Sequence, residues 1–356
     1  MSKVLTQNLL PGMITAEDIY SYTNQLILPK NLVLTDKAIT KLELYSVLSI
    51  RIKDESEPAE PPEDNTYSAK IKSSPEFIKF SKDFENSVDQ VRNSLNDLVM
   101  RKNVAINIDN LMTETLTLLK NNPNCIHIFD MLHNMRHYDD PTYSHSLNVA
   151  IICYAFGKWL KFPGEELNTL MLCGLLHDIG KLAISNTIIS KPAKLTEAEY
   201  QIVKTHALEG YNLLKDLSIN EHIKNSALMH HERCDGTGYP EGVKADQIDE
   251  YAKIVAIADV YDAMTSARIY RGPLCPFQVI EIFENEGLQK YDSKYILTFL
   301  EGIVNTYVKN RIRLNNGLEG DVVLINKRHL ARPMVQCGGQ YIDLALKPNL
   351  HIEAII

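Results

Sequence analysis

Histidine and aspartate side chains recur between residues 145 and 259 in positions that could hold a divalent metal. They are His145, the adjacent His177 and Asp178, His206, the adjacent His230 and His231, and Asp259. Imidazole nitrogens and carboxylates together suit a borderline divalent metal such as Mn, Fe, Co or Zn. Asp259 follows an apolar run, and a buried carboxylate is costly unless it is paired or bound to a cation. Each of these signals alone is also explained by an ordinary core residue, so the prediction depends on their combination.

A lysine close to the first pair adds a group that suits phosphate. Lys181 comes four residues after His177, so on a helix the two side chains would lie on the same face. A lysine ammonium is a compact point charge that can contact a phosphate oxygen. We therefore expect Lys181 to act beside a metal site.

The second histidine pair leads directly into a segment, residues 232–240, that has the composition of a shaped loop. Gly236 and Gly238 permit positive φ, and Pro240 stiffens the exit. Tyr239 could stack on a base or pack inwards. An isolated Gly-Tyr-Pro would indicate only a turn, and its position after two histidines makes it a candidate substrate contact.

Composition limits the class of protein. The chain has 356 residues, 45% of them apolar, and a formal net charge of −8. An acidic chain is a poor candidate for binding a nucleic acid polymer, which requires a basic face. Its six cysteines lack C-x-x-C spacing, which argues against a disulfide framework and a zinc ribbon. We find no secretory signal and no apolar stretch that could span a membrane, so we expect a cytoplasmic protein.

Changes in composition divide the chain into five segments. We predict a small α/β module over residues 1–55, an acidic proline-rich linker over 56–74 and connecting helices over 75–122. A helical catalytic domain would cover 123–311, and a small β module 312–356. The fold class is therefore mainly α. The helices of 75–122 either pack against the next domain or form a homodimer contact, and both readings stay open.

Several elements can be predicted within these segments. Residues 26–28, 32–34 and 49–52 are typical of short strands, and Thr35 can cap a helix that runs to Tyr45. Thr196 followed by Glu199 predicts a capping box and a helix to about Leu214. In the tail, residues 322–325, 334–335 and 342–344 are strand-like runs, and Asn316-Gly317 and Gly338-Gly339 supply turns.

The motifs together resemble the HD-GYP subgroup of the HD phosphohydrolase superfamily. The resemblance includes the stretches 177–181 and 230–240, and it covers residues 123–305 without a gap. It implies an all-helical catalytic domain that hydrolyses cyclic di-GMP to linear pGpG, to GMP, or to both, in bacterial signalling. It also implies two divalent ions, Fe or Mn, as cofactors.

The resemblance assigns a role to each matching residue. Lys181 would contact the scissile phosphate, and Asp178 would bridge two ions and share in catalysis. Asp262 would orient a ligand or an arginine. The metal ligands would be His145, His177, Asp178, His206, His230, His231 and Asp259, and Tyr239, Arg268 and Arg271 would join Lys181 in binding the substrate.

One departure from the family pattern bears on the metal count. Some relatives bind a third metal through a glutamate four residues before the first histidine, and that position here is Pro141. We therefore expect a two-metal centre. Three alternatives remain: another cyclic dinucleotide as substrate, a regulatory module that binds without catalysis, and a helical scaffold with incidental histidines.

Overall fold

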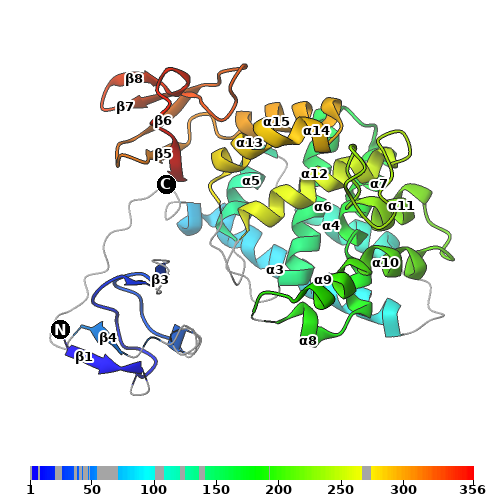
Figure 1. Ribbon diagram of the computed structural model, residues 1–356, viewed down its shortest axis with the longest axis horizontal. Coiled ribbons are helices and arrows are strands. Elements are labelled where there is room, and N and C mark those ends of the chain that lie inside the picture. Colours follow the sequence, from blue (N-terminus) through cyan, green and yellow to red (C-terminus); the bar gives the residue numbers. More distant parts are fainter. Residues whose placement is uncertain are drawn as a thin grey trace. The chain divides into compact units, whose positions relative to one another are not determined.

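The computed structural model comprises two compact units, Met1–Asp64 and Asn65–Ile356, and each is described by itself (Figure 1). The residues described are 2–6, 9–20, 26–35, 38–39, 42, 47, 49–53, 71–100, 108–120, 125–135, 141–191, 193–266 and 274–356. No helix within these ranges is both long and apolar enough to cross a membrane.

The first unit has two antiparallel strand pairs around a small apolar core. Strand β1 (Ser2–Leu5) pairs with β4 (Ser49–Ile52), and β2 (Ile19–Tyr20) pairs with β3 (Leu26–Leu28). The two strands predicted at residues 26–28 and 49–52 are therefore confirmed. The strand predicted at 32–34 is wrong, because Val33 forms only an isolated bridge, to Ile14.

The predicted helix start in this unit is present. The hydroxyl oxygen of Thr35 accepts a hydrogen bond from the backbone N–H of Ala38 at 3.3 Å, which is the geometry of an N-terminal cap. Tyr45, where the helix was predicted to end, lies outside the described residues, as does most of the predicted linker.

The second unit is a helical domain followed by a sheet, which confirms the mainly α fold class with a β module after it. Its first helices are α3 (Pro75–Met100), α4 (Ile108–Lys120) and α5 (Cys125–Asn134). The elements that follow are α6 (Pro141–Trp159), α7 (Gly164–Leu176), the 3₁₀ helix η2 (Ile179–Ala183), α8 (Asn186–Ile189), α9 (Glu197–Lys204), α10 (His206–Leu214), α11 (Glu221–Met229), α12 (Glu250–Thr265), α13 (Pro276–Ile282), the π-helix η3 (Phe283–Gly287), α14 (Leu288–Lys290) and α15 (Ser293–Thr306).

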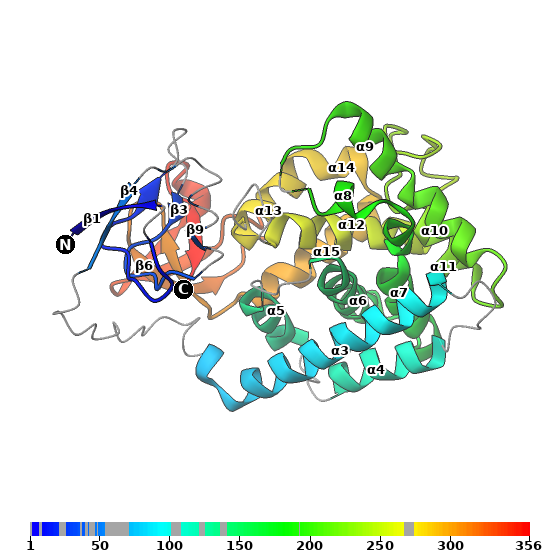
Figure 2. The same ribbon diagram turned by 90° about the horizontal axis from the view of Figure 1, so that it is seen from below.

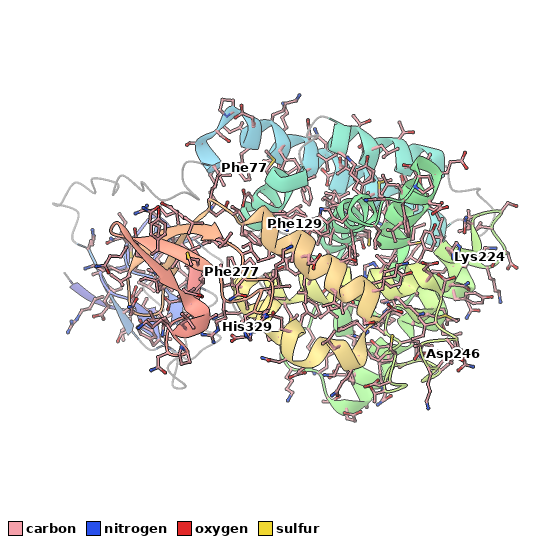
Figure 3. All side chains as sticks on the ribbon, turned by 90° about the horizontal axis from the view of Figure 1, so that it is seen from above. Phe77, Phe129, Lys224, Asp246, Phe277 and His329 are labelled. Carbon is pink, nitrogen blue, oxygen red and sulfur yellow. The ribbon has the colours of Figure 1, made fainter. Side chains whose placement is uncertain are left out.

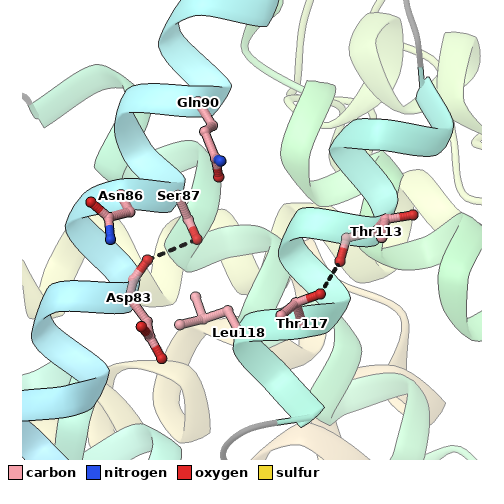
Figure 4. Close-up of a pocket in the computed structure, with 7 residues that line it drawn as sticks. All are labelled: Asp83, Asn86, Ser87, Gln90, Thr113, Thr117 and Leu118. Atoms are coloured by element: carbon pink, nitrogen blue, oxygen red, sulfur yellow. Dashed lines mark hydrogen bonds between the residues drawn. The ribbon is translucent and has the colours of Figure 1, made fainter.

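Helices α3 and α4 lie side by side along one face of the helical domain (Figure 2). Apolar residues recur along α3 at helical spacing, so they form one stripe. Phe80, Phe84, Val88 and Val91 in that stripe are completely buried in the core of this unit. The sequence left open whether the apolar residues of 75–122 pack against the next domain or form a homodimer contact. In α3 they pack inside their own unit. A small pocket between the two helices is lined by Asp83, Asn86, Ser87, Gln90, Thr113, Thr117 and Leu118 (Figure 4).

The chain ends in a five-stranded antiparallel sheet with the strand order β8-β7-β6-β5-β9 (Figure 1). Strands β6 (Glu319–Leu324), β7 (Met334–Cys337) and β8 (Gln340–Asp343) fall where strands were predicted, whereas β5 (Arg311–Leu314) and β9 (Ile352–Ile355) were not predicted. Both are short and contain polar residues, so they lack a strong apolar signal. The inward side chains of this sheet belong to the same apolar core as the helices.

The predicted capping box is confirmed, but the helix after it is not continuous. The Thr196 hydroxyl oxygen accepts the Glu199 N–H at 3.3 Å, and the Glu199 carboxylate accepts the Thr196 N–H at 2.7 Å. Thr205 then separates α9 from α10, although the sequence pattern predicted one helix to Leu214. The break makes His206 the first residue of α10.

A close contact between two glycines fixes the start of α10 against η2. A Cβ atom on Gly180 would lie 1.9 Å from the His206 carbonyl oxygen and 2.4 Å from the Gly210 backbone nitrogen. Backbone atoms cannot move aside as a flexible side chain can. Any residue larger than glycine at 180 must therefore push α10 away from η2.

We predict that Gly180→Ala lowers the free energy of unfolding of the second unit by about 1–3 kcal/mol or more, because the added methyl group overpacks this contact. Gly164→Ala is the matched control. Position 164 begins α7 and a Cβ there would meet nothing within 4 Å, so alanine should be neutral or slightly stabilising. Urea unfolding followed by far-UV circular dichroism measures both, and equal midpoints would contradict the prediction.

Candidate metal centre

The seven predicted ligands come together where several helices begin or end. His145 lies on α6 and Asp259 on α12, whereas His206 begins α10. His177 and His230 are the residues that cap the C-terminal ends of α7 and α11, and Asp178 and His231 follow them. His145 and His231 are partly buried, and the other members are buried.

The His177–Asp178 step differs from the helical turn that the sequence suggested. Helix α7 ends at Leu176, and η2 begins at Ile179, so His177 and Lys181 do not share one helix. Lys181 instead contacts Asp178, three residues before it, through an ion pair between its ammonium group and Oδ2. The change of helix type turns both oxygens of Asp178 towards the histidines.

The ligand atoms fall into two groups, and within each they all lie within 4.8 Å of one another. One group is Asp178, His206, His230 and His231, and the other is His145, His177 and Asp259. Every one of the seven side chains predicted from the sequence belongs to one of these groups.

Asp178 lies between the two groups and faces each with a different oxygen. Its Oδ1 lies 3.3 Å from the Nε2 atom of His206 and 3.7 Å from that of His230. Its Oδ2 lies 3.3 Å from Nε2 of His177 and 3.5 Å from Nε2 of His145. Asp178 therefore has the geometry of a carboxylate that could contact two ions at once.

Backbone carbonyl groups set the orientation of three imidazole rings. A carbonyl oxygen can only accept, so the Nδ1 atom that contacts it carries the hydrogen and Nε2 keeps a lone pair. These contacts join His177 to Gly174 at 2.7 Å, His206 to Val203 at 2.6 Å and His230 to Ser226 at 2.9 Å. All three Nε2 lone pairs consequently point into the cluster.

The resulting arrangement needs a cation. The Nε2 atoms of His206 and His230 lie 3.2 Å apart, and neither carries a hydrogen if both Nδ1 atoms donate to carbonyls. Two facing lone pairs repel each other unless a proton or a metal lies between them. Nε2 of His177 and Oδ1 of Asp178 are also buried without a hydrogen-bond partner in the described part of the chain. The donor set therefore fits a divalent metal.

Burial and charge hold most of these groups in the protonation state that binds metal. Burial lowers the pKa of His206 and His230 and lowers that of His231 to about 3, so all three are neutral at pH 7. Burial alone would raise the pKa of Asp178, but Lys181 and the adjacent imidazoles hold it well below its ordinary value. Neutral imidazole and ionised carboxylate are the ligand forms.

His145 is oriented by a carboxylate instead of a carbonyl. Its Nδ1 atom lies 2.7 Å from Oδ2 of Asp262, while the other oxygen of Asp262 accepts from Asn148 at 3.0 Å. Burial opposes protonation of His145, but hydrogen bonds to Asp259 and Asp262 outweigh it and raise the pKa of His145 to about 9. Asp262 fixes Nδ1 as the donor and leaves Nε2 directed at the cluster.

The loop after the histidine pair is held against the cluster by a ring stack and by a buried carboxylate. The ring of Tyr239 stacks on that of His231, with centroids 4.6 Å apart and planes at 29°. Gly236 has the positive φ that the sequence suggested, whereas Gly238 is required because a Cβ there would lie 2.4 Å from the Glu232 Cα atom. The buried carboxylate of Glu232 accepts the Glu241 N–H at 2.8 Å and so closes the loop.

Two of the predicted substrate contacts lie where the structure gives no description. Sequence reasoning also overlooked some residues near the cluster. Arg268 and Arg271 lie outside the described residues. Sequence reasoning did not identify Glu232, Tyr200 or Lys204, all of which lie near the cluster or its loop. The carboxylate directly after two histidines was the available signal for Glu232, whereas nothing local distinguishes Lys204 from a surface lysine.

We predict that Asp262→Asn weakens metal binding by about 10–100-fold while the fold survives, because the carboxylate that orients His145 is lost. Isothermal titration of the metal-free protein with Mn²⁺ measures the affinity. Asp246→Asn is the control, since Asp246 is an exposed carboxylate outside both groups (Figure 3). Unchanged affinity in Asp262→Asn would contradict the orienting role.

A solved structure has a similar fold. A Bdellovibrio bacteriovorus protein described as an HDG"Y"P protein aligns with 84% of this chain and 97% of its own length, with a TM-score of 0.51 and 13% identity. At this identity the likeness shows a common fold. It agrees with the helical domain followed by a sheet described above.

Curated relatives cover part of the chain. A cyclic di-GMP phosphodiesterase of Pseudomonas aeruginosa is 35% identical over 199 residues, which is 56% of this chain and 48% of the relative. A 3′3′-cGAMP-specific phosphodiesterase of Vibrio cholerae is 40% identical over 145 residues, covering 41% of this chain and 34% of the relative. The chain thus spans less than half the length of either relative. The family model described as HD domain matches residues 127–295, which lie within the stretch where the sequence resembles the HD phosphohydrolase superfamily.

Proposed function

We propose that the chain is a metal-dependent phosphodiesterase that hydrolyses cyclic di-GMP to linear pGpG, to GMP, or to both. One observation carries the proposal: Asp178 directs its two oxygens at two groups of imidazoles, and Lys181 lies directly beside it. The arrangement combines metal ligands with a phosphate-binding cation. The activity for which the Pseudomonas relative is named supports cyclic di-GMP as the substrate.

The proposed cofactors are two divalent ions, Fe or Mn, held by the two ligand groups. His145, His177 and Asp259 would hold one ion, His206, His230 and His231 the other, and Asp178 would contact both. Divalent ions in such a pair polarise a phosphoryl oxygen and lower the pKa of a bound water. Nitrogen and oxygen donors of this kind are compatible with Fe and Mn.

The chain's own residues would position the substrate. Lys181 donates to Asp178, and its ammonium group has three N–H donors, so it can also reach a phosphoryl oxygen. A fixed positive charge there stabilises the negative charge that develops on the phosphate during cleavage. Tyr239, Arg268 and Arg271 are the proposed contacts to the rest of the dinucleotide.

A mixed cyclic dinucleotide is the second candidate substrate. The Vibrio relative, whose name specifies 3′3′-cGAMP, is 40% identical to this chain over the aligned residues. The two candidates differ in one base and share both phosphodiesters, so the metal groups cannot distinguish them. A non-catalytic binding module is less well supported, because every ligand position and Lys181 are filled.

A homodimer through residues 75–122 stays a proposal. The apolar stripe of α3 is already buried in its own unit, so a dimer would have to use the opposite, more polar face of this helix. The cytoplasmic location expected from the sequence likewise stays a prediction.

We predict that protein purified anaerobically without chelator opens cyclic di-GMP, that activity follows its Fe or Mn content, and that EDTA abolishes it. Asp178→Ala should reduce turnover by several orders of magnitude, because both ligand groups lose a shared oxygen donor. Asp246→Ala serves as the control on an exposed carboxylate. Product analysis by chromatography with metal content on the same sample is the measurement, and an active, fully metal-loaded Asp178→Ala would refute the assignment.

We also predict a higher kcat/KM for cyclic di-GMP than for 3′3′-cGAMP in parallel assays at one metal loading. The ratio of the two values measures discrimination between the substrates. A ratio in favour of 3′3′-cGAMP would assign the chain to the second substrate and leave the metal chemistry unchanged.

A further inference from the structure

A lysine at the C-terminal end of α9 lies against two tyrosine rings beside the cluster. The ammonium nitrogen of Lys204 is 5.3 Å from the centroid of the Tyr200 ring and 5.7 Å from that of the Tyr239 ring. Both distances are within the range of a cation–π interaction. Tyr200 lies one helical turn before Lys204, and Tyr239 comes from the loop after the histidine pair.

This group is continuous with the candidate metal centre. Tyr239 is stacked on the ring of His231, and its ring centroid is 6.4 Å from that of His206. His206 follows Lys204 by two residues across the break between α9 and α10. One tyrosine ring therefore separates the Lys204 ammonium from an imidazole of the cluster. Tyr200 is 44% exposed, so the outer side of the group is accessible to a ligand.

The ion pairing of Lys204 differs from that of Lys181 and Lys191. Lys181 is paired with Asp178, and Lys191 is paired with Glu199 at 2.7 Å. Lys204 has no carboxylate within 4.0 Å in the part of the chain that the structure describes. Tyrosine faces attract the ammonium group without using its N–H donors, so those donors remain available for an anion.

We propose that Lys204, held by Tyr200 and Tyr239, binds the phosphodiester of the substrate that is not being cleaved. The inference rests on the proposed function. A cyclic dinucleotide has two phosphodiesters, and the scissile one must lie at the ligand groups beside Lys181. The other carries a full negative charge on the far side of the ring and needs a separate cation. Lys204 is a cation of this kind, one aromatic ring outside the cluster.

The proposal assigns Lys204 to binding and leaves the bond-breaking step to the cluster. Removing the charge should therefore raise KM and leave kcat nearly unchanged. The same loss should appear with cyclic di-GMP and 3′3′-cGAMP, because the two share both phosphates. Hydrolysis of a diester that has one phosphate and no second anionic group should keep its kcat/KM.

The test compares Lys204→Met, Lys204→Arg and a control, Lys327→Met, in metal-loaded protein. Lys327 is exposed between β6 and β7. For Lys204→Met we expect KM for cyclic di-GMP and 3′3′-cGAMP to rise about tenfold, as for loss of one charged hydrogen bond, and kcat/KM for bis(p-nitrophenyl) phosphate to stay unchanged. Lys204→Arg should restore most of the affinity, and Lys327→Met should behave as the unsubstituted protein.

Three outcomes would overturn the assignment. They are an unchanged KM for both dinucleotides, a rise confined to one of them, which would indicate a base contact, and an equal loss on bis(p-nitrophenyl) phosphate, which would indicate a disturbed cluster. Titration with the bis-phosphorothioate analogue of cyclic di-GMP gives the dissociation constant independently of turnover. If the unsubstituted protein neither binds this analogue nor cuts either dinucleotide, the proposed function fails and the role of Lys204 fails with it. If the unsubstituted protein cuts a dinucleotide and Lys204→Met has the same KM for it, only the role of Lys204 fails.

Discussion

Repulsion between converging lone pairs is the constraint around which the helical domain is organised. His206 and His230 direct Nε2 atoms at each other across 3.2 Å, and Asp178 directs a buried oxygen at both. Buried polar groups without partners are costly, so a folded chain that retains this arrangement requires a compensating cation. The identity of the buried residues thus implies metal binding before any reaction is considered.

Helix ends provide most of the geometry that this constraint demands. The last turns of α7 and α11 carry the carbonyl oxygens of Gly174 and Ser226, and the histidines at those ends donate Nδ1–H to them. The Ser226 oxygen also accepts the backbone N–H of His230. The same bonds satisfy the helix ends and fix the imidazole tautomers. The glycine contact between η2 and α10 then brings the histidine of α10 to the same point.

Positive charge is arranged in two layers around the cluster. Lys181 lies inside and is neutralised by Asp178, whereas Lys204 lies one tyrosine ring further out and is held by aromatic faces. A chain with a net charge of −8 can therefore still present cations to a small anionic ligand at one place. The local placement of these two side chains matters more for such a ligand than the overall charge.

The sequence by itself determined the types of the clustered residues, the helical character of residues 75–120, the capping box at Thr196 and three of the five C-terminal strands. These features depend on residues that are close in the chain or that repeat with a helical or strand period, so the local sequence is enough to predict them. Tertiary structure alone decided the break at Thr205, the pairing of His145 with Asp262, and the position of Lys204 between two tyrosines. His145 and Asp262 are separated by 117 residues, and no local period records a contact across that distance. The break at Thr205 lies beside another long-range contact, that of Gly180 on η2 with the first turn of α10, which the local helical pattern does not record.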